Sequence, residues 1–340
     1  MRLLLLNFGY EDDAVMERAI AGADVTIDMR RATPGMPQTL TPAETAEVDG
    51  LITYSPNAPI WAAPAAFPRC RVVLRSGVGF DNVDIAAWGK RGVPVCNVPD
   101  YGTTEVADHA IALMLSFARG TATYQQNLRR DPQAGWRFAD APLVRRLRGA
   151  VIGIVGLGRI GLAAALRAQA FGMRVHFYDP YLPNGSELSV GFTRVPTLDA
   201  LMAVSDVVSV HAPLSAETRD MMGAKAFAAA KPGMILINTA RGPVVDLAAL
   251  ATAIRDGKVG GAGLDVLPTE PADANHPLIA AWLKGEPWIE GRLVLSPHAA
   301  FYSPSSIEDL RRKSVETVLD YIRNGRLANC VNREFLVAKP

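Results

Sequence analysis

The sequence V-I-G-I-V-G-L-G-R-I-G-L-A-A-A-L-R-A-Q-A-F-G-M-R-V-H-F-Y-D-P, residues 151–180, carries the clearest structural signal in this 340-residue chain. It begins with the apolar run Val151 to Val155, which suits a parallel strand buried on both faces. Three glycines follow at G-x-G-x-x-G spacing, and an alanine-rich helical pattern then leads to a second apolar run that ends at Asp179. The stretch predicts a strand, a glycine turn, a helix and a second strand.

The glycines and the acid together suit a dinucleotide. Gly156 permits the tight turn, Gly158 lets a pyrophosphate approach the backbone, and Gly161 lets the helix pack close to the strand. The N–H groups of Arg159 and Ile160 then face the phosphates at a helix N-terminus. A carboxylate at Asp179 accepts from the adenosine ribose and repels a 2′-phosphate, which favours NAD over NADP. Glycines at this spacing also occur in ordinary turns, so the prediction depends on the whole combination.

Length and charge limit the possible functions. A chain of 340 residues exceeds what one core usually holds, so we expect two domains. The formal net charge is +1, and a balanced total favours a solvated or subunit-contact surface over nucleic-acid binding for the one dense basic cluster. That cluster comprises Arg129, Arg130, Arg137, Arg145, Arg146 and Arg148.

Cysteines and apolar runs indicate the compartment. Cys70, Cys96 and Cys330 have no metal-type spacing, so no metal site is predicted and reduced thiols are expected. The N-terminal M-R-L-L-L-L-N-F has too short an apolar core for a secretory signal, and no run approaches the roughly 18 apolar residues of a membrane span. We therefore expect a cytoplasmic protein without a membrane partner.

Apolar runs alternate with helical patterns before the glycine turn. Strands are expected at Leu3 to Phe8, Val25 to Met29, Leu51 to Tyr54, Val72 to Leu74 and Val93 to Cys96, with helices from about Asp12 and Asp84. Pro94 suggests a strand start or a sheet edge. This pattern predicts a small parallel sheet.

The stretch R-S-G-V-G-F-D-N, residues 75–82, follows one of these strands. It is either a plain turn or a set of backbone N–H groups beside a cation, suited to a small carboxylate. Asn97-Val98-Pro99 is a plausible hinge before a helix from Thr103 to Arg119, in which His109 is expected to be packed or in polar contact. Residues 125–148 have weak periodicity and could form an arm that reaches a second subunit.

The alternation resumes after residue 180 and predicts a doubly wound parallel sheet of about six strands. Strands are expected at Val207 to His211, Met234 to Asn238, Gly261 to Val266 and Leu293 to Ser296, with helices near Leu198, Ala224 and Asp246. Pro268 to Gly291 is expected to be a long loop, and a last helix, Ile307 to Asn324, to cross back onto the first domain. His176 and His211 are expected to be structural.

Three side chains stand where loops leave these strands: Arg241, Glu270 and His298. Histidine is the natural acid–base group near neutral pH, and a carboxylate bonded to it fixes its orientation. Arginine can grip a planar carboxylate with two hydrogen bonds. The trio fits dehydrogenation of a hydroxy acid, although spacing alone also allows a structural salt bridge.

The chain resembles the D-isomer-specific 2-hydroxyacid dehydrogenases from end to end, most of all their C-terminal-binding protein branch. The motifs that carry the resemblance are R-S-G-V-G-F-D-N-V-D (75–84), G-L-G-R-I-G (156–161), Y-D-P-Y (178–181), H-A-P-L (211–214), N-T-A-R-G (238–242), G-L-D-V-L-P-T-E-P (263–271), S-P-H-A-A-F-Y-S (296–303) and N-C-V-N-R-E-F (329–335). It implies a Rossmann NAD-binding domain, residues 99–301, inserted in a smaller flavodoxin-like substrate domain, residues 1–98 and 302–340. It also implies a homodimer.

The resemblance assigns roles to particular residues. His298 is the acid–base, Glu270 its partner and Arg241 the substrate anchor, while Asp265 touches the nicotinamide end of the cofactor. Other implied cofactor contacts are Val78, Thr104, Gly156, Gly158, Arg159, Ile160, Gly161, Asp179, Ala212, Pro213, Thr218, Thr239, Ala240 and Ala300. Implied substrate contacts are Arg75, Ser76, Gly77 and Val78. The pocket for the substrate's own side chain is expected to depend on Tyr54, Phe301 and Tyr302.

Two departures from the branch affect the expected function. Phe301 stands where a tryptophan is typical, which bears on pocket size, and the long disordered tail of the animal members does not follow Pro340. The leading prediction is an NAD-dependent oxidoreductase that interconverts a small 2-oxo acid and its D-2-hydroxy acid. The alternatives are an NAD(H)-sensing interaction protein of the corepressor type and a phosphoglycerate dehydrogenase.

Overall fold

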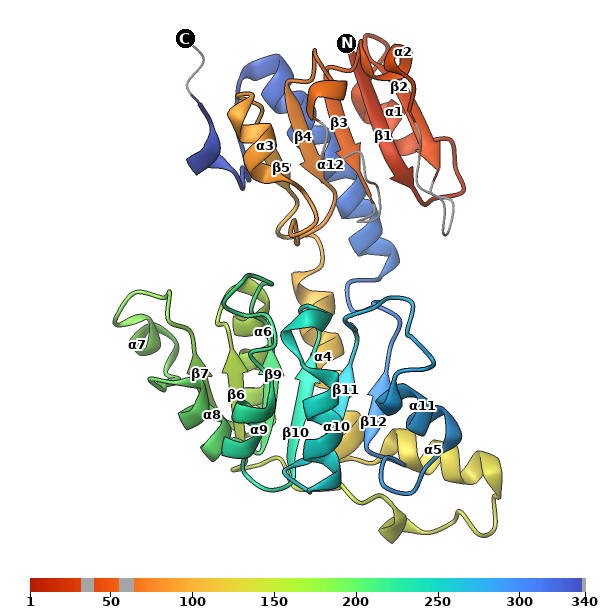
Figure 1. Ribbon diagram of the computed structural model, residues 1–340, viewed down its shortest axis with the longest axis vertical. Helices are drawn as coiled ribbons and strands as arrows, with labels where there is room; N and C mark the ends of the chain where they lie inside the picture. Colours follow the sequence, from red (N-terminus) through yellow and green to blue (C-terminus); the bar gives the residue numbers. More distant parts are fainter. Residues whose placement is uncertain (32–39, 55–63, 338–340) are drawn as a thin grey trace. The chain divides into compact units, whose positions relative to one another are not determined.

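The chain folds into two compact units, formed by Met1–Gly102 with Tyr302–Pro340 and by Thr103–Phe301 (Figure 1). The computed structural model describes residues 1–31, 40–54 and 64–337. Each unit has its own parallel sheet and its own core, and each is described separately below.

The first unit is built on a five-stranded parallel sheet with the order β2-β1-β3-β4-β5. This is the flavodoxin-like order. The edge strand β5 begins directly after Pro94, as predicted, because a proline can donate no hydrogen bond to a central ladder. The strands are β1 (Arg2–Phe8), β2 (Thr26–Arg31), β3 (Gly50–Thr53), β4 (Val72–Arg75) and β5 (Val95–Asn97).

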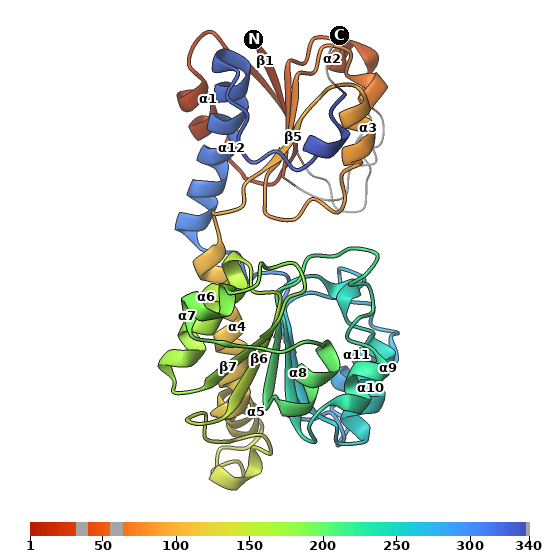
Figure 2. The ribbon, with the colours of Figure 1, turned by 90° about the vertical axis from the view of Figure 1, so that its left-hand side faces the viewer.

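Alternate residues of β1 point to opposite faces of this sheet, and both faces are buried. Leu3 and Leu5 share a core with α12 (Pro304–Asn324), whereas Leu4 and Leu6 share one with Trp88 of α3 (Ile85–Lys90). Figure 2 shows α1 (Val15–Ala21) and α12 on one side of the sheet and α3 on the other. The short α2 (Pro42–Thr45), η2 (Pro64–Ala66) and η5 (Arg333–Phe335) complete the unit.

The second unit is built on a seven-stranded parallel sheet with the order β12-β11-β10-β9-β6-β7-β8. Counted within the unit and read from the β8 edge, this order is 3-2-1-4-5-6-7, the Rossmann order with one strand added. The order reverses between β6 and β9, where such folds bind their ligands. The strands are β6 (Val151–Val155), β7 (Arg174–Tyr178), β8 (Thr193–Arg194), β9 (Val207–Val210), β10 (Met234–Asn238), β11 (Val259–Leu264) and β12 (Leu293–Leu295).

Helices cover both faces of this sheet, as the doubly wound prediction requires. In Figure 2, α4 (Thr103–Ala118) and α6 (Arg159–Ala170) lie on one face, and the helices α8 to α11 lie on the other. The latter are α8 (Leu198–Val204), α9 (Ala224–Ala229), α10 (Leu247–Arg255) and α11 (Pro277–Lys284). The remaining helical segments are α5 (Thr121–Arg130), η3 (Phe138–Asp140), α7 (Ser186–Val190) and η4 (Gly242–Val244).

Three sequence predictions about elements need correction. The expected loop 268–291 contains α11, whose Leu278, Ile279 and Ala281 are buried. The segment 125–148, thought irregular, starts within α5, which buries none of its residues and so has little apolar periodicity. The sheet has seven strands rather than about six, because the two-residue edge strand β8 was too short to recognise.

None of the described helices is both long and apolar enough to cross a membrane.

Candidate active site

The glycine turn between β6 and α6 has the geometry that its sequence predicted. Gly156 has a φ of +86°, which favours glycine, and a Cβ there would lie 3.0 Å from the backbone nitrogen of Ala212. A Cβ on Gly161 would lie 2.1 Å from the carbonyl oxygen of Gly156, so this glycine is needed for close packing. Gly158 is different, because a Cβ there would meet no atom within 4 Å. The space beside Gly158 is therefore open at the N-terminus of α6.

Asp179 is fixed beside this turn. Its Oδ2 accepts from the backbone N–H of Leu157 at 2.9 Å, and its Oδ1 accepts from that of Tyr181 at 3.0 Å. Each carboxylate oxygen keeps a further lone pair for another donor. The carboxylate is thus held at the glycine turn with acceptor capacity to spare.

The segment after β9 packs against the glycine turn. Ala212 is buried against Gly156, and Thr218 Oγ1 donates to the carbonyl oxygen of Pro213 at 2.6 Å. His211 bonds through Nε2 to Ser209 Oγ at 2.9 Å, and burial lowers its pKa to about 4. This imidazole is therefore neutral near pH 7.

The loop after β10 carries Arg241 and is shaped by Asn238. The Asn238 side chain donates to the carbonyl oxygen of Arg241 at 2.9 Å and accepts from the N–H of Ala240 at 3.0 Å. Such side-chain bonds to local backbone fix tight turns. Among the described residues, the buried Thr239 Oγ1 has no hydrogen-bond partner, so it is a polar group for which a ligand would supply one.

Gly242 brings two loops of the site together. A Cβ at this position would lie 1.9 Å from the carbonyl carbon of Leu267, so only glycine lets the loops after β10 and β11 approach. The N–H of Leu267 in turn donates to Glu270 Oε1 at 3.0 Å. The roles of Asn238 and Gly242 were not predicted, although both residues lie in the quoted motif N-T-A-R-G.

His298 and Glu270 form a direct pair, with Nδ1 of the imidazole 2.8 Å from Oε2 of the carboxylate. Partial burial would raise the pKa of Glu270, but the hydrogen bonds from His298 and from the N–H of Leu267, with the positive charge of Arg241, lower it overall. The carboxylate is thus held ionised, and the imidazole must donate from Nδ1. The His298 side chain is 43% exposed.

The segment that carries His298 is held by Asp265. This carboxylate is 2% exposed and accepts from Ser296 Oγ at 2.6 Å, from the N–H of Ala299 at 2.9 Å and from the N–H of Ala300 at 3.0 Å. His109 of α4 bonds to Ser296 Oγ through Nε2 at 2.8 Å, so it is in polar contact, as predicted. The resemblance assigns Asp265 to the cofactor, and the structure adds that its oxygens bond to the histidine loop.

Two further predicted residues of this unit are accounted for. Phe301 packs edge-on against the His298 ring, with the ring centroids 6.2 Å apart. Thr104 lies in the first turn of α4, where its hydroxyl donates to Glu105 at 2.7 Å.

The predicted carboxylate-binding turn lies in the first unit, after β4. Gly77 has a φ of +148°, and the Arg75 guanidinium donates back to the carbonyl oxygen of Ser76. Ser76 is buried and its hydroxyl bonds to Ser314 of α12 at 2.8 Å. No described residue accepts a hydrogen bond from the backbone N–H of Gly77, Val78 or Gly79. The turn therefore offers backbone donors, while the Ser76 hydroxyl is already used.

Tyr54, also in the first unit, belongs to an aromatic cluster with Phe8 and Tyr10. Its hydroxyl donates to Glu17 at 3.2 Å, and Glu17 in turn pairs with the buried guanidinium of Arg311. Burial raises the pKa of Tyr54 well above its ordinary value. The hydroxyl therefore stays protonated and is directed at Glu17.

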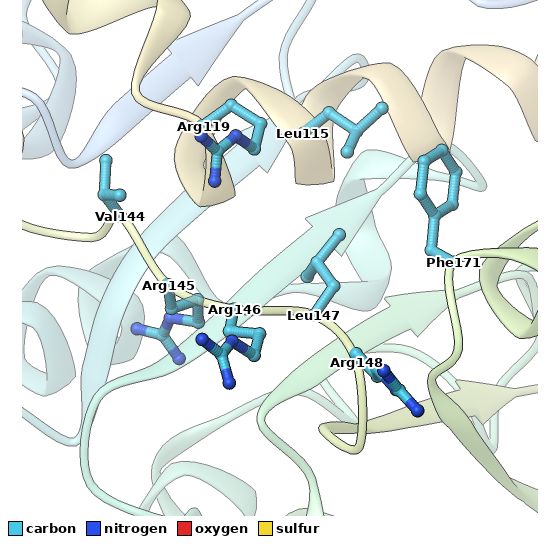
Figure 3. Close-up of a pocket in the computed structure, with 8 residues that line it drawn as sticks. All are labelled: Leu115, Arg119, Val144, Arg145, Arg146, Leu147, Arg148 and Phe171. Carbon is cyan, nitrogen blue, oxygen red and sulfur yellow. The ribbon is translucent and has the colours of Figure 1, made fainter.

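An open pocket of about 670 Å³ lies in the second unit, at the amino ends of the strands and away from the carboxyl ends that carry the predicted site (Figure 3). Its lining includes residues just before β6 and β7, so it adjoins the amino ends of the strands. The glycine turn, Arg241 and Glu270 all follow carboxyl ends. The pocket is thus separate from the predicted chemistry, and its lining comprises Leu115, Arg119, Val144, Arg145, Arg146, Leu147, Arg148 and Phe171.

Comparison with known proteins defines the class to which this site belongs. Residues 111–300 match the family described as D-isomer specific 2-hydroxyacid dehydrogenase, NAD binding domain. The chain belongs to this family of oxidoreductases, and its second unit is built to bind a nicotinamide dinucleotide.

Particular relatives are similar over most of the chain. A glyoxylate reductase from Korarchaeum cryptofilum is 37% identical over 278 residues, which cover 81% of this chain and 80% of that protein. C-terminal-binding protein 1 from Caenorhabditis elegans is 35% identical over 277 residues, which cover 79% of this chain but 37% of that protein. A crystal structure of an NADPH-dependent glyoxylate/hydroxypyruvate reductase from Sinorhizobium meliloti, in complex with NADP and malonate, is 31% identical with a TM-score of 0.81. That match covers 100% of this chain and 99% of the other.

Proposed function

We propose that this protein interconverts a small D-2-hydroxy acid and its 2-oxo acid by hydride transfer to and from NAD. The observation that carries the proposal is the His298–Glu270 pair, which lies with Arg241 on loops after β10, β11 and β12. This is the edge at which doubly wound sheets bind their ligands.

His298 acts as the acid–base. When it reduces a 2-oxo acid, its Nε2 donates a proton to the carbonyl oxygen; in the reverse direction the same nitrogen removes the hydroxyl proton. Glu270 accepts from Nδ1 at 2.8 Å and so holds the ring in the orientation that presents Nε2. The carboxylate also stabilises the imidazolium form, which is the proton donor.

Arg241 anchors the substrate. Its guanidinium can form two parallel hydrogen bonds to the substrate carboxylate, and its positive charge can polarise the neighbouring carbonyl group. We propose that Arg75 and the free N–H groups of residues 77–79 also serve the carboxylate, and that Tyr54 and Phe301 limit the size of the substrate's side chain.

The residues of the second unit fit a dinucleotide. The open space at Gly158 and the amides at the start of α6 suit the diphosphate, and Asp179 suits the adenosine ribose. When bound, the nicotinamide supplies or accepts the hydride. The carboxylate of Asp179 disfavours a 2′-phosphate, so we propose NAD rather than the NADP of the Sinorhizobium enzyme.

We also propose a homodimer formed through the segment that links α5 to β6. Trp136 and Phe138 in this segment are 80% and 91% exposed, and exposed aromatic side chains are enriched at protein–protein interfaces. The cytoplasmic location expected from the sequence remains a prediction.

NADH oxidation with a panel of 2-oxo acids tests the function. We expect turnover with glyoxylate, pyruvate or hydroxypyruvate, slower turnover with NADPH, and the D isomer wherever the product is chiral. Tight NADH binding without turnover of any acid would instead support the interaction-protein alternative. Turnover of a phosphorylated 2-oxo acid in the panel, and of no other acid, would support a phosphoglycerate dehydrogenase.

A further inference from the structure

We propose that His109 and Ser296 are positioning residues that hold the His298 loop in its active conformation, acting through Asp265. The inference rests on the proposed function of His298. Its geometry lies wholly within the second unit, where α4 passes beside the carboxyl ends of β11 and β12.

The direction of the hydrogen bonds follows from counting protons. Ser296 has one hydroxyl proton and donates it to Asp265 Oδ1 at 2.6 Å. The bond between His109 Nε2 and Ser296 Oγ, 2.8 Å long, must then have the imidazole as donor. His109 therefore carries its proton on Nε2, and the chain of donors runs from His109 to Ser296 to Asp265. This ring nitrogen also lies 3.6 Å from Asp265 Oδ1.

In the described part of the chain, the donors to the buried Asp265 carboxylate all come from one segment. Its three close donors, the Ser296 hydroxyl and the N–H groups of Ala299 and Ala300, all belong to residues 296–300. The N–H of His298 donates to the Asp265 carbonyl oxygen at 2.8 Å. Asp265 thus binds residues that precede His298 and residues that follow it.

His298 needs this support because its backbone is unfavourable. Its φ is +53°, in the left-handed region that residues with a Cβ seldom adopt. A loop that holds such a conformation relaxes when its contacts weaken, and the imidazole would then move away from the position fixed by Glu270. Loss of His109 would leave the Ser296 hydroxyl and the carboxylate without their outer donor.

Hydrogen exchange of the peptide that covers residues 293–303 tests the positioning without using activity. In His109→Leu, the amides of residues 298–300 should exchange about tenfold faster than in the wild type. In His109→Gln, whose Nε2 can donate from the same position, exchange should return to near the wild-type rate. Asp108→Asn is the matched control, because it removes the negative charge that faces Arg167 from the neighbouring position of α4 and leaves the loop untouched. Unchanged protection in His109→Leu would overturn the proposal, whatever the substrate of the enzyme proves to be.

Kinetics then tests the link to catalysis. His109→Leu and Ser296→Ala should lower kcat about 10- to 100-fold, since a displacement of about 1 Å can have that effect, while KM for NADH stays near the wild-type value. His109→Gln should recover most of kcat, and Asp108→Asn should keep it. Wild-type kcat in His109→Leu, together with faster exchange, would show that the loop moves without any catalytic consequence and would refute the positioning role. A wild-type protein without turnover would contradict only the proposed function.

Discussion

At the level of single residues, the candidate active site is shaped by a few side chains that constrain one another. Glu270 is oriented by the N–H of Leu267. The loop that carries Gly242 can approach Leu267 only because Gly242 lacks a side chain. Arg241 precedes that glycine and adds its charge to the same carboxylate. The proposed acid–base pair and the proposed anchor are therefore coupled through two loops rather than placed independently.

Arg241→Lys should lower kcat/KM by about 100-fold or more. An ammonium keeps the charge but cannot form the forked pair of hydrogen bonds to a carboxylate, which is the interaction that orients the substrate. Steady-state kinetics with the best 2-oxo acid measures the effect, and NADH affinity by fluorescence titration serves as the control. A variant within about twofold of the wild type would show that Arg241 does not anchor the substrate.

At the scale of elements, the three glycines of the turn before α6 should respond differently to substitution. Gly158→Ala should leave the melting temperature unchanged and weaken NADH binding by about tenfold or more, because a Cβ there meets only open space that the diphosphate would fill. Gly161→Ala should unfold at a lower temperature, since its Cβ would lie 2.1 Å from a backbone oxygen. Calorimetry and NADH titration of both variants separate the two effects. Equal NADH binding by Gly158→Ala and the wild type would contradict the diphosphate site.

His211, which directly follows β9, should make the free energy of unfolding depend on pH. Burial lowers the pKa of His211 to about 4, whereas an exposed histidine titrates near 6.5. The unfolded chain therefore binds this proton at higher pH, so the stabilisation is complete above about pH 6.5 and is lost as the pH falls towards about 4.

Replacing His211 by Gln should flatten this dependence, by up to about 3 kcal/mol across that interval. Urea unfolding at several pH values gives the slope, and His276→Asn, which keeps a side-chain acceptor at the start of α11, provides the comparison. The same slope in His211→Gln and in the wild type would disprove a buried neutral imidazole.

Comparing the predicted with the observed helices and strands shows which parts of the fold can be predicted from the sequence. The Val151–Asp179 unit was predicted correctly because strand, glycine turn and acid are local in sequence. Helix α11 was missed because the prolines and charges around it suggested a loop, and α5 because it buries none of its residues. The bond between His109 and Ser296 could not be predicted, since 187 residues separate them and only Ser296 lies in one of the quoted motifs.

At the scale of the whole molecule, two sheets of different order divide the chain. The alternation of strands and helices in the sequence predicted two parallel sheets, and the structure supplies their strand orders, 2-1-3-4-5 and 3-2-1-4-5-6-7. Tyr54 was predicted to border the pocket for the substrate's side chain, and within its own unit its hydroxyl donates to Glu17. That bond depends on the buried Glu17–Arg311 pair, whose partners are 294 residues apart and so were not predictable from spacing.

The subunit arrangement gives a prediction at this scale. The double variant Trp136→Ala with Phe138→Ala should be a monomer at concentrations where the wild type is a dimer, because it removes two exposed aromatic anchors. Light scattering after size exclusion measures the masses. Leu188→Ala is the control, since this side chain is 84% exposed but lies in α7. A wild type that is monomeric, or a double variant that remains dimeric, would refute this interface.

The acid–base role of His298 is tested most directly by comparing kcat of the wild type with that of His298→Asn, under conditions in which both bind NADH equally. We expect kcat to fall by about 100- to 10,000-fold in the variant, since general acid–base catalysis contributes that much, while the dissociation constant for NADH changes less than about twofold. Turnover by His298→Asn at a rate near that of the wild type would contradict this role.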